Sequence, residues 1–368
     1  MNGLRLLSVA IVWLTLACHS GAEHAPSVAS SAPAAAAPAA APTAAAVASE
    51  QAPPRQVVRV GTLNVVSDAM FYIGRERGYF AAEGLDLDFT VFDSAQQMIA
   101  PMGAGQLDVG GGGPGPGLTN AILRGVPVRV VADRLQSLPG TRSTCLVARN
   151  DLVDAGSLQG FADLRGRVFA ENVPGNITTY VFDQELSRAN LSPQDLTYTI
   201  VPFPEMVTAF ANDVVDVAVL PEPFITIGQG RGVFTCWRPI ADLSPGFQVA
   251  VLLYSPSFVE NEDLGRRFMV GYVRAVRDYY RAFFGDGSGR ADLLPIITEN
   301  TSVKNPELLE RMAPNAIDPD GRVNVDSLRA TQHWYHEQGA VPAEVDMAQM
   351  VDLRFVDYAV SRLGPYPR

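Results

Sequence analysis

The chain has 368 residues, of which 47% are hydrophobic and 18% charged, a composition typical of globular proteins rather than disordered ones. Its 28 basic and 39 acidic residues give a net charge of -11, which argues against nucleic acid and anionic membrane surfaces as partners. The length is sufficient for two compact lobes.

The chain begins with the layout of an export signal. Arg5 precedes an apolar run that ends at Ala17 and is too short to span a bilayer. The stretch 14–18 (LTLAC) resembles a bacterial lipoprotein signal, in which the cysteine is lipidated after cleavage; ordinary cleavage after Ala22 is the alternative. We therefore expect residues 1–17 to be an export signal and the protein to lie in the bacterial periplasm or cell envelope. A lipid on Cys18 would be its only membrane anchor.

Residues 18–56 predict a disordered tether. They are mostly Ala, Pro, Ser and Val, without Phe, Trp or Tyr and without a hydrophobic period. Such a segment cannot bury enough apolar surface to form a core.

From residue 57 the chain alternates between strand and helix patterns with short connections. Short apolar runs predict strands, and apolar positions three and four apart predict helices. The expected strands are 57–63, 85–92, 107–110, 128–133, 144–148, 167–170, 196–201, 216–220 and 247–254. The expected helices between them are 69–79, 96–102, 118–123, 179–189 and 205–212. This order predicts two α/β lobes with mostly parallel sheets.

Beyond residue 254 the pattern is helical. In the predicted helix 258–284, aromatic and apolar side chains recur at spacings of three and four, which is typical of a face packed on a core. They are Phe268, Tyr272, Val276, Tyr279 and Phe283. Further helices are expected at 293–298, 306–312, 326–338 and 347–362, packed around one lobe.

Cys145 and Cys236 lie in separate strand-like runs of a chain that we expect to be exported, a setting in which disulfides persist. A bond between them would close a loop of 91 residues (236 minus 145), which the chain-entropy model values at about 4–5 kcal/mol. Two separate buried thiols are the alternative.

Four segments, in their order and spacing, resemble the nitrate/sulfonate/taurine-type substrate-binding proteins of ABC importers. They are 68–86 (DAMFYIGRERGYFAAEGLD), 105–109 (GQLDV), 163–168 (DLRGRV) and 216–224 (DVAVLPEPF), within a region of resemblance from about 57 to 284. The resemblance implies a type II periplasmic-binding fold, in which two α/β lobes joined by two chain crossings close on a small molecule. We expect lobe I to comprise 57–148 plus 247–368 and lobe II 149–246, with crossings near 148–152 and 242–247.

Ligands of open α/β sheets sit beyond the carboxyl ends of the strands, where helix N-termini and loop N–H groups gather. The residues that follow the predicted strands are therefore candidate ligand contacts: Ser67, Asp68, Phe71, Asp93, Ser94, Gly113, Pro114, Asn172, Asn176, Thr178 and Glu222. Plain N-capping is the alternative role for Ser67, Asp93, Ser94, Asn176 and Thr178. Glu222 is the sharpest candidate, because helix propensity does not explain a carboxylate between two prolines.

The glycine-rich stretch 108–120 (DVGGGGPGPGLTN) contains a G-x-G-x-x-G pattern without its usual context. Arg129 and Val130 stand where a dinucleotide-binding fold has an acidic residue, and no Lys follows for a phosphate loop. Pro114 and Pro116 lack N–H donors, so the turn predicts a surface for close approach of a flat ligand rather than an oxyanion cradle.

The charged residues expected near the cleft are mostly acidic. They are Asp68, Asp93, Asp133, Glu171, Glu205 and Glu222, against Arg134 and Arg142. We therefore expect a neutral or amine-bearing organic ligand, for example an aromatic heterocycle such as a vitamin-precursor pyrimidine, with a sulfonate or nitrate as the alternative.

No pattern in the sequence indicates an enzyme. His333 and His336 share a predicted helix without a third metal ligand, and no G-x-S-x-G is present. The pyrimidine-synthase enzymes that share this fold would need an active-site histidine and a cysteine-rich motif, and neither is visible. We expect a monomer without metal or cofactor that delivers a small molecule to an ABC permease in the inner membrane. A receptor that signals without transport and an exported enzyme are the alternatives.

Overall fold

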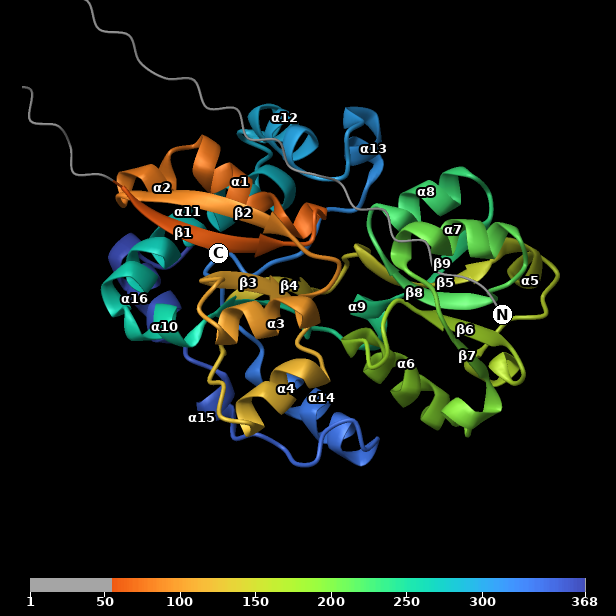
Figure 1. The fold of residues 1–368 in the computed structure, drawn as a ribbon. Helices are drawn as coiled ribbons and strands as arrows, with labels where there is room; N and C mark the ends of the chain where they lie inside the picture. The colour runs from red at the N-terminus through yellow and green to blue at the C-terminus, as the bar shows by residue number, and fades with distance from the viewer. Residues whose placement is uncertain (1–54, 368) are drawn as a thin grey trace, which may run out of the picture. The chain divides into compact units, whose positions relative to one another are not determined.

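The computed structural model describes residues 55–367, so the predicted export signal, Cys18 and nearly all of the predicted tether lie outside the described residues. By their contacts, the described residues belong to a single unit. Within this unit the strands form two five-stranded sheets (Figure 1).

The first sheet has the strand order β2-β1-β3-β10-β4. Its strands are β1 (Gln56–Thr62), β2 (Leu85–Val91), β3 (Val109–Gly112), β4 (Arg129–Ser137) and β10 (Phe247–Tyr254). β1 is parallel to β2 and β3, whereas β10 is antiparallel to both β3 and β4. The carboxyl ends of β1 to β4 therefore meet at one edge.

The second sheet repeats this plan with the order β7-β6-β8-β5-β9. Its strands are β5 (Thr144–Arg149), β6 (Val168–Glu171), β7 (Thr197–Ile200), β8 (Val217–Pro221) and β9 (Phe234–Pro239). Only β5 is reversed relative to the others. In each sheet the reversed strand is the one that the chain enters on arriving from the other sheet.

One predicted boundary between the lobes is wrong. We assigned the run 144–148 to lobe I, but this strand pairs with β8 and β9 and belongs to the second sheet. The first crossing is therefore at 138–143, and the second, which includes α9 (Ile240–Leu243), ends at β10. Adjacent runs at 128–133 and 144–148 are both strand-like, and only their cross-strand partners show which sheet each one joins.

The predicted helices appear in the predicted order, most of them with ends shifted by one to three residues, whereas four short helices were not predicted: Tyr79–Ala82, Asn150–Asp154, Phe224–Gly230 and Ile240–Leu243. Between the strands lie α1 (Ala69–Glu76), α2 (Tyr79–Ala82), α3 (Ala95–Gly103), α4 (Pro116–Leu123), α5 (Asn150–Asp154), α6 (Ile177–Arg188), α7 (Phe203–Ala211) and α8 (Phe224–Gly230). The C-terminal part contains α10 (Pro256–Glu260), α11 (Glu262–Phe284), α12 (Arg290–Asn300), α13 (Pro306–Arg311), α14 (Val325–Glu337), α15 (Met347–Met350) and α16 (Arg354–Leu363). The predicted helix 258–284 is interrupted at Asn261 and forms α10 and α11. The predicted helix 347–362 is interrupted at 351–353 and forms α15 and α16.

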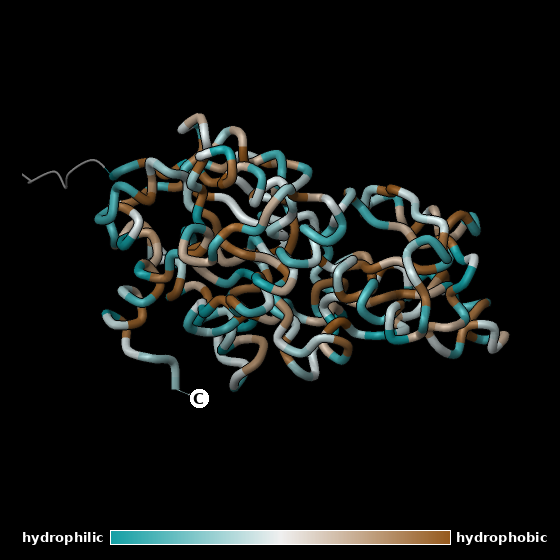
Figure 2. The backbone as a smooth tube through the Cα atoms, turned by 90° about the horizontal axis from the view of Figure 1, so that it is seen from below, coloured by the Kyte–Doolittle hydropathy of each residue, from teal (hydrophilic) through white to brown (hydrophobic). Residues whose placement is uncertain are grey.

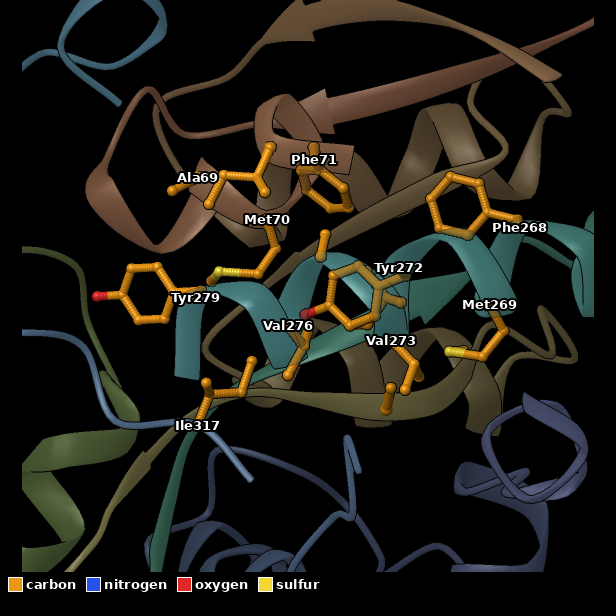
Figure 3. Close-up of a cluster of buried hydrophobic side chains, with 14 of the residues drawn as sticks. Ala69, Met70, Phe71, Phe268, Met269, Tyr272, Val273, Val276, Tyr279 and Ile317 are labelled. Carbon is orange, nitrogen blue, oxygen red and sulfur yellow. The ribbon is translucent and has the colours of Figure 1, made fainter. Parts of the chain in front are cut away.

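Helix α11 supplies one face of the largest core. Its aromatic stripe is buried as predicted, with Phe268, Tyr272 and Tyr279 at most 1% exposed and Phe283 partly buried. Figure 3 shows this stripe facing Phe71 of α1. Complete burial of one such side chain stabilises a fold by about 1.5–3 kcal/mol, so α11 holds the first sheet and its covering helices together.

The C-terminal helices pack mainly on the first sheet, as predicted, but two of them reach further. α16 packs along α11, and α15 contacts β4 and α4 (Figure 1). α13 also contacts α8, and α14 also contacts α6, both of which belong to the second sheet. The C-terminal part thus adds contacts between the two lobes beyond the chain crossings.

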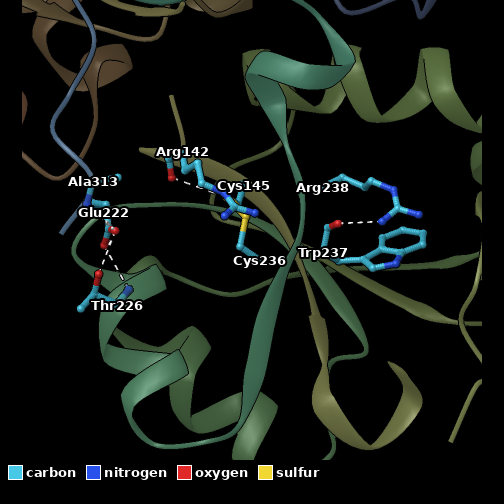
Figure 4. Close-up of a disulfide and its surroundings, with 8 residues drawn as sticks. All are labelled: Arg142, Cys145, Glu222, Thr226, Cys236, Trp237, Arg238 and Ala313. Atoms are coloured by element: carbon cyan, nitrogen blue, oxygen red, sulfur yellow. Dashed lines mark hydrogen bonds between the residues drawn. A yellow bond between two sulfur atoms is a disulfide. The ribbon is translucent and has the colours of Figure 1, made fainter. Parts of the chain in front are cut away.

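Cys145 and Cys236 form a disulfide that joins the neighbouring strands β5 and β9 (Figure 4), with their Cα atoms 5.5 Å apart. This confirms the paired alternative over two separate thiols. The bond fixes the edge strand β9 to the reversed strand of the second sheet.

None of the helices within residues 55–367 is long and apolar enough to cross a membrane. Figure 2 shows the corresponding pattern, in which hydrophobic and hydrophilic segments alternate along the described chain.

Candidate ligand-binding cleft

A cleft of about 730 Å³ lies between the two sheets. It is lined by residues that follow β1, β2 and β3 of the first sheet and β6, β7 and β8 of the second. This is the position expected for a ligand of open α/β sheets. Its volume is within the range of small-molecule sites, about 300–1,000 Å³.

Most of the predicted contact residues line this cleft. They are Ser67, Asp93, Ser94, Gly113, Asn172, Asn176, Thr178 and Glu222. The structure thus brings together residues from five strand ends that are up to 155 positions apart (222 minus 67). That these residues bind a ligand stays a prediction.

Asp68 does not line the cleft, although we expected it among the ligand contacts. Its side chain is fully buried and paired with Arg134, which is also fully buried. Asp68 also accepts hydrogen bonds from the backbone N–H groups of Leu63 and Val65, at 2.9 and 3.0 Å. Asp68 therefore fixes the loop after β1 from the buried side, whereas its neighbour Ser67 lines the cleft.

Phe71 and Pro114 are also misplaced by the sequence prediction. The ring of Phe71 is 1% exposed and lies 5.8 Å from the ring of Tyr272, within the core. Pro114 is buried between the lining residues Gly113 and Gly115 without lining the cleft itself. Phe71 lies on the face of α1 that packs against α11, and sequence alone does not show which helix that face meets. Pro114 lies in the turn between β3 and α4, where the direction of a side chain depends on backbone torsions that the order of residues does not specify.

The cleft contains two carboxylates and no cationic side chain. Asp93 and Glu222 are the charged residues among its described lining, and no Lys, Arg or His lines it. Asp133 and Arg134 are buried elsewhere, while Glu205 and Arg142 are exposed outside the cleft. The charged lining of the cleft is therefore acidic, as expected from the sequence, but only two of the six expected acidic residues contribute to it.

Glu222 is 5% exposed and lies between Thr226 and Ala313 (Figure 4). Its carboxylate accepts hydrogen bonds from the N–H and hydroxyl of Thr226, at 3.1 and 2.8 Å, and from the N–H of Ala313, at 3.2 Å. Burial raises the pKa of Glu222, and these hydrogen bonds oppose the rise. Because Ala313 follows α13, Glu222 also links the second sheet to the C-terminal part of the chain.

The N-capping alternative holds for Asn176 and not for Ser94. The Asn176 side chain accepts hydrogen bonds from the N–H and hydroxyl of Thr178, at 2.9 and 2.8 Å, at the start of α6. Ser94 precedes α3 but its side chain makes no capping hydrogen bond. The Ser94 hydroxyl is thus available to the cleft.

The glycine run is explained by close packing. A Cβ atom at Gly111 would lie 2.6 Å from the carbonyl oxygen of Val251, and one at Gly113 would lie 3.3 Å from the Ile177 side chain. Gly112 has a φ of 148°, which favours glycine. The run therefore lets β3 approach β10 and lets the first lobe approach the second, and it is not a phosphate loop.

Aromatic side chains form part of the cleft wall. Phe203 of α7 and Phe224 of α8 stack with their ring centroids 5.8 Å apart, and both line the cleft together with Phe92. Stacked rings offer a flat apolar surface that suits a planar ligand.

Several lining residues were not predicted from the sequence, and among the polar ones Thr144 and Asn315 are the most buried, at 6% and 5% exposure. Thr144 begins a strand instead of following one. Asn315 lies after α13, outside the region of family resemblance. Asn64 and Gln96 also line the cleft, and their places beside Ser67 and Ser94 could have indicated them.

Solved structures share this fold at low sequence identity. The nitrate-binding protein NrtA from Synechocystis PCC 6803 is 14% identical, with a TM-score of 0.67, covering 84% of this chain and 89% of NrtA. The aliphatic sulphonate-binding protein SsuA from Escherichia coli is 17% identical, with a TM-score of 0.64, covering 81% of this chain and 92% of SsuA. The desulfurization enzyme DSZB is 15% identical, with a TM-score of 0.57, covering 84% of this chain and 100% of DSZB. These matches confirm the type II periplasmic-binding fold.

No curated protein sequence is a significant match to the chain. A family model described as NMT1/THI5 like matches residues 67–281, which is 215 of the 368 residues (281 minus 67, plus one). The matched region spans most of both sheets and the start of the C-terminal helices. The chain therefore belongs to the NMT1/THI5-like family.

Proposed function

We propose that this protein is an extracytoplasmic solute-binding protein that captures a small, neutral or amine-bearing organic molecule for an ABC importer. The observation that carries the proposal is a cleft between two lobes whose described lining has two carboxylates, stacked phenyl rings and no cation. A sulfonate or nitrate would need positive charge or free N–H donors, whereas a protonated amine or a ring N–H finds an acceptor at Asp93 or Glu222.

The mechanism is lobe closure. The lining comes from both sheets, so a ligand contacts both lobes at once only when they are close together. Ligand binding then shifts the population from open to closed forms, by as much as the ligand prefers the closed form. The closed form is the one that an ABC permease would recognise, and Cys18, if lipidated, would keep the protein near that permease.

A ligand screen tests this proposal. Thermal shift and calorimetry would compare wild-type protein with four classes of compound: aminopyrimidines, organic amines, alkanesulfonates and nitrate. We expect binding of the first or second class and about tenfold or greater weakening in Glu222→Gln. Glu205→Gln is the matched control, because Glu205 is exposed outside the cleft. Stabilisation by sulfonates or nitrate together with an unaffected Glu222→Gln variant would refute the proposed ligand class.

The other candidate functions have distinct signatures. SsuA and NrtA are named for sulphonate and nitrate, so an anion remains the second candidate ligand. DSZB shows that the fold also supports an enzyme, and turnover of a bound compound would identify one here. The described lining contains no Cys or His to act as nucleophile or base, which favours binding without chemistry. Permease and ATPase genes beside this gene would favour import over signalling.

A further inference from the structure

One hydrogen bond joins the two lobes beside the cleft. The backbone N–H of Ala313, in the segment after α13, donates to Oε1 of Glu222, in the segment after β8, at 3.2 Å (Figure 4). The two residues are 91 positions apart in the chain, and Glu222 is 5% exposed. The bond is therefore formed away from bulk water, where a hydrogen bond to an ionised carboxylate is stronger than one between neutral groups.

The first lobe holds Ala313 in place from both sides. Met312, directly before it, is 6% exposed and belongs to the core that α11 covers. Asn315, two residues after it, donates its backbone N–H to the hydroxyl of Tyr279 in α11 at 3.0 Å. Ala313 therefore moves with the first lobe.

The second lobe holds Glu222 in the same way. Pro221, directly before it, pairs with Thr144 of β5 in the second sheet. The carboxylate also accepts hydrogen bonds from the N–H and hydroxyl of Thr226, in the first turn of α8, at 3.1 and 2.8 Å. Glu222 therefore moves with the second lobe, and its bond to Ala313 breaks when the lobes separate on this side.

Stabilisation of α8 alone does not account for this arrangement. The two donors of Thr226 belong to the same lobe as Glu222 and support the start of α8 whether or not the lobes are close. The N–H of Ala313 is supplied by the other lobe, beside the contact between α13 and α8. The position of Ala313 thus matters only for the relation between the lobes.

We propose that Glu222 and Ala313 form a latch that favours the closed form of the two lobes before any ligand binds. Opening on this side removes one of the three donors of a buried carboxylate. The unliganded protein therefore populates the closed form, and a ligand has to supply less of the free energy of closure. Tyr335 and Gly175 join the lobes at α14 and before α6, so loss of the latch shifts the equilibrium without abolishing closure.

Ala313→Pro tests the latch, because proline removes the N–H and leaves the side chain of Glu222 unchanged. The N–H of Ala313 makes no other hydrogen bond within residues 55–367. The backbone accepts the substitution, since Pro314 already follows Ala313 and Met312 is extended, with a ψ of 145°.

Small-angle X-ray scattering of the full chain without ligand would measure the radius of gyration. We expect a larger radius in Ala313→Pro than in wild type, and also in Glu222→Gln, which weakens the bond by removing the charge. The double variant should have the same radius as Ala313→Pro, because both changes act on one bond.

Thr226→Val is the matched control, because it removes a donor to the same carboxylate from within the second lobe. Its radius should equal that of wild type. An unchanged radius in Ala313→Pro, or an equal increase in Thr226→Val, would overturn the latch. If circular dichroism shows that Ala313→Pro does not fold, Glu222→Gln decides the question in its place. Because no ligand is present, this result leaves the proposed function intact, and a failed ligand screen leaves the latch intact.

Discussion

The hydroxyl of Tyr335, in α14, donates a hydrogen bond of 3.0 Å to the carbonyl oxygen of Gly175, in the loop before α6. Tyr335 is 1% exposed and Gly175 lines the cleft. Beside this contact, Trp334 and Tyr180 pack with their ring centroids 5.9 Å apart. A helix of the C-terminal part thus holds a cleft loop of the second lobe.

Tyr335→Phe should loosen this contact while keeping the packing of the ring. The Gly175 carbonyl loses its donor, so we expect the ligand to dissociate roughly 2–10 times faster, because one neutral hydrogen bond contributes about 0.5–1.5 kcal/mol. Stopped-flow measurement of ligand release would show the change. The control is Tyr358→Phe, because Tyr358 is a partly buried tyrosine of α16 that does not line the cleft. An unchanged release rate in Tyr335→Phe would show that this hydrogen bond does not stabilise the closed form.

Asp68→Asn should strongly destabilise the fold. It leaves the fully buried guanidinium of Arg134 without its counter-charge, which typically costs about 3–5 kcal/mol. Urea unfolding would measure the loss. Asp86→Asn, which breaks the half-exposed pair with Arg55, should change stability little. Similar effects of the two variants would contradict the structural role of Asp68.

Asp133 should make stability depend on pH. It is fully buried, accepts hydrogen bonds from Gln248 and from the N–H of Asp318, both at 2.7 Å, and burial raises its pKa to about 7. The folded protein therefore keeps this proton up to about pH 7, whereas the unfolded chain releases it near pH 4. The resulting stabilisation is complete below about pH 4 and is lost as the pH rises through 7.

Asp133→Asn tests this dependence. The difference between the unfolding free energies at pH 5 and pH 8 should shrink by roughly 1–3 kcal/mol, as measured by urea unfolding. Asp88→Asn, at an exposed position of β2, should leave that difference as in wild type. An equal pH dependence in Asp133→Asn and wild type would show that Asp133 is ionised throughout this range.

Loss of the disulfide should destabilise the second sheet. Cys145→Ala and Cys236→Ala should each lower the unfolding free energy by about 2–5 kcal/mol, because the unfolded chain gains conformational freedom. The double variant should lose little more than either single one, since one bond is removed in all three. Thermal melting with and without dithiothreitol would test this, and reductant should affect only the wild type. A reduced wild type that melts like the oxidised one would contradict the prediction.

The family resemblance and the element order were accessible from sequence because both are local patterns. Alternation of apolar runs and helical periods depends on neighbours within about ten residues, and so does the aromatic stripe of α11. The same holds for the lining residues that directly follow strands, such as Ser94 and Glu222. Their positions follow from the rule that the carboxyl ends of parallel strands share one edge.

The sequence-based predictions failed where a structural feature depends on residues far apart in the sequence. The run 144–148 forms a strand in either lobe, and its pairing with β8 and β9 decides the sheet. Asp68 and Ser67 are adjacent, yet one faces Arg134 and the other the cleft. The choice depends on Arg134, a side chain 66 residues away (134 minus 68).

The sequence by itself determined that this chain forms two α/β lobes of a type II periplasmic-binding fold, and it predicted the acidic residues that line the cleft at the strand ends. Only the tertiary structure decided which side chains reach that site. Thr144 and Asn315 enter the cleft through contacts between segments far apart in the sequence. Burial and hydrogen-bond satisfaction are properties of such contacts, and no local pattern of residues encodes them.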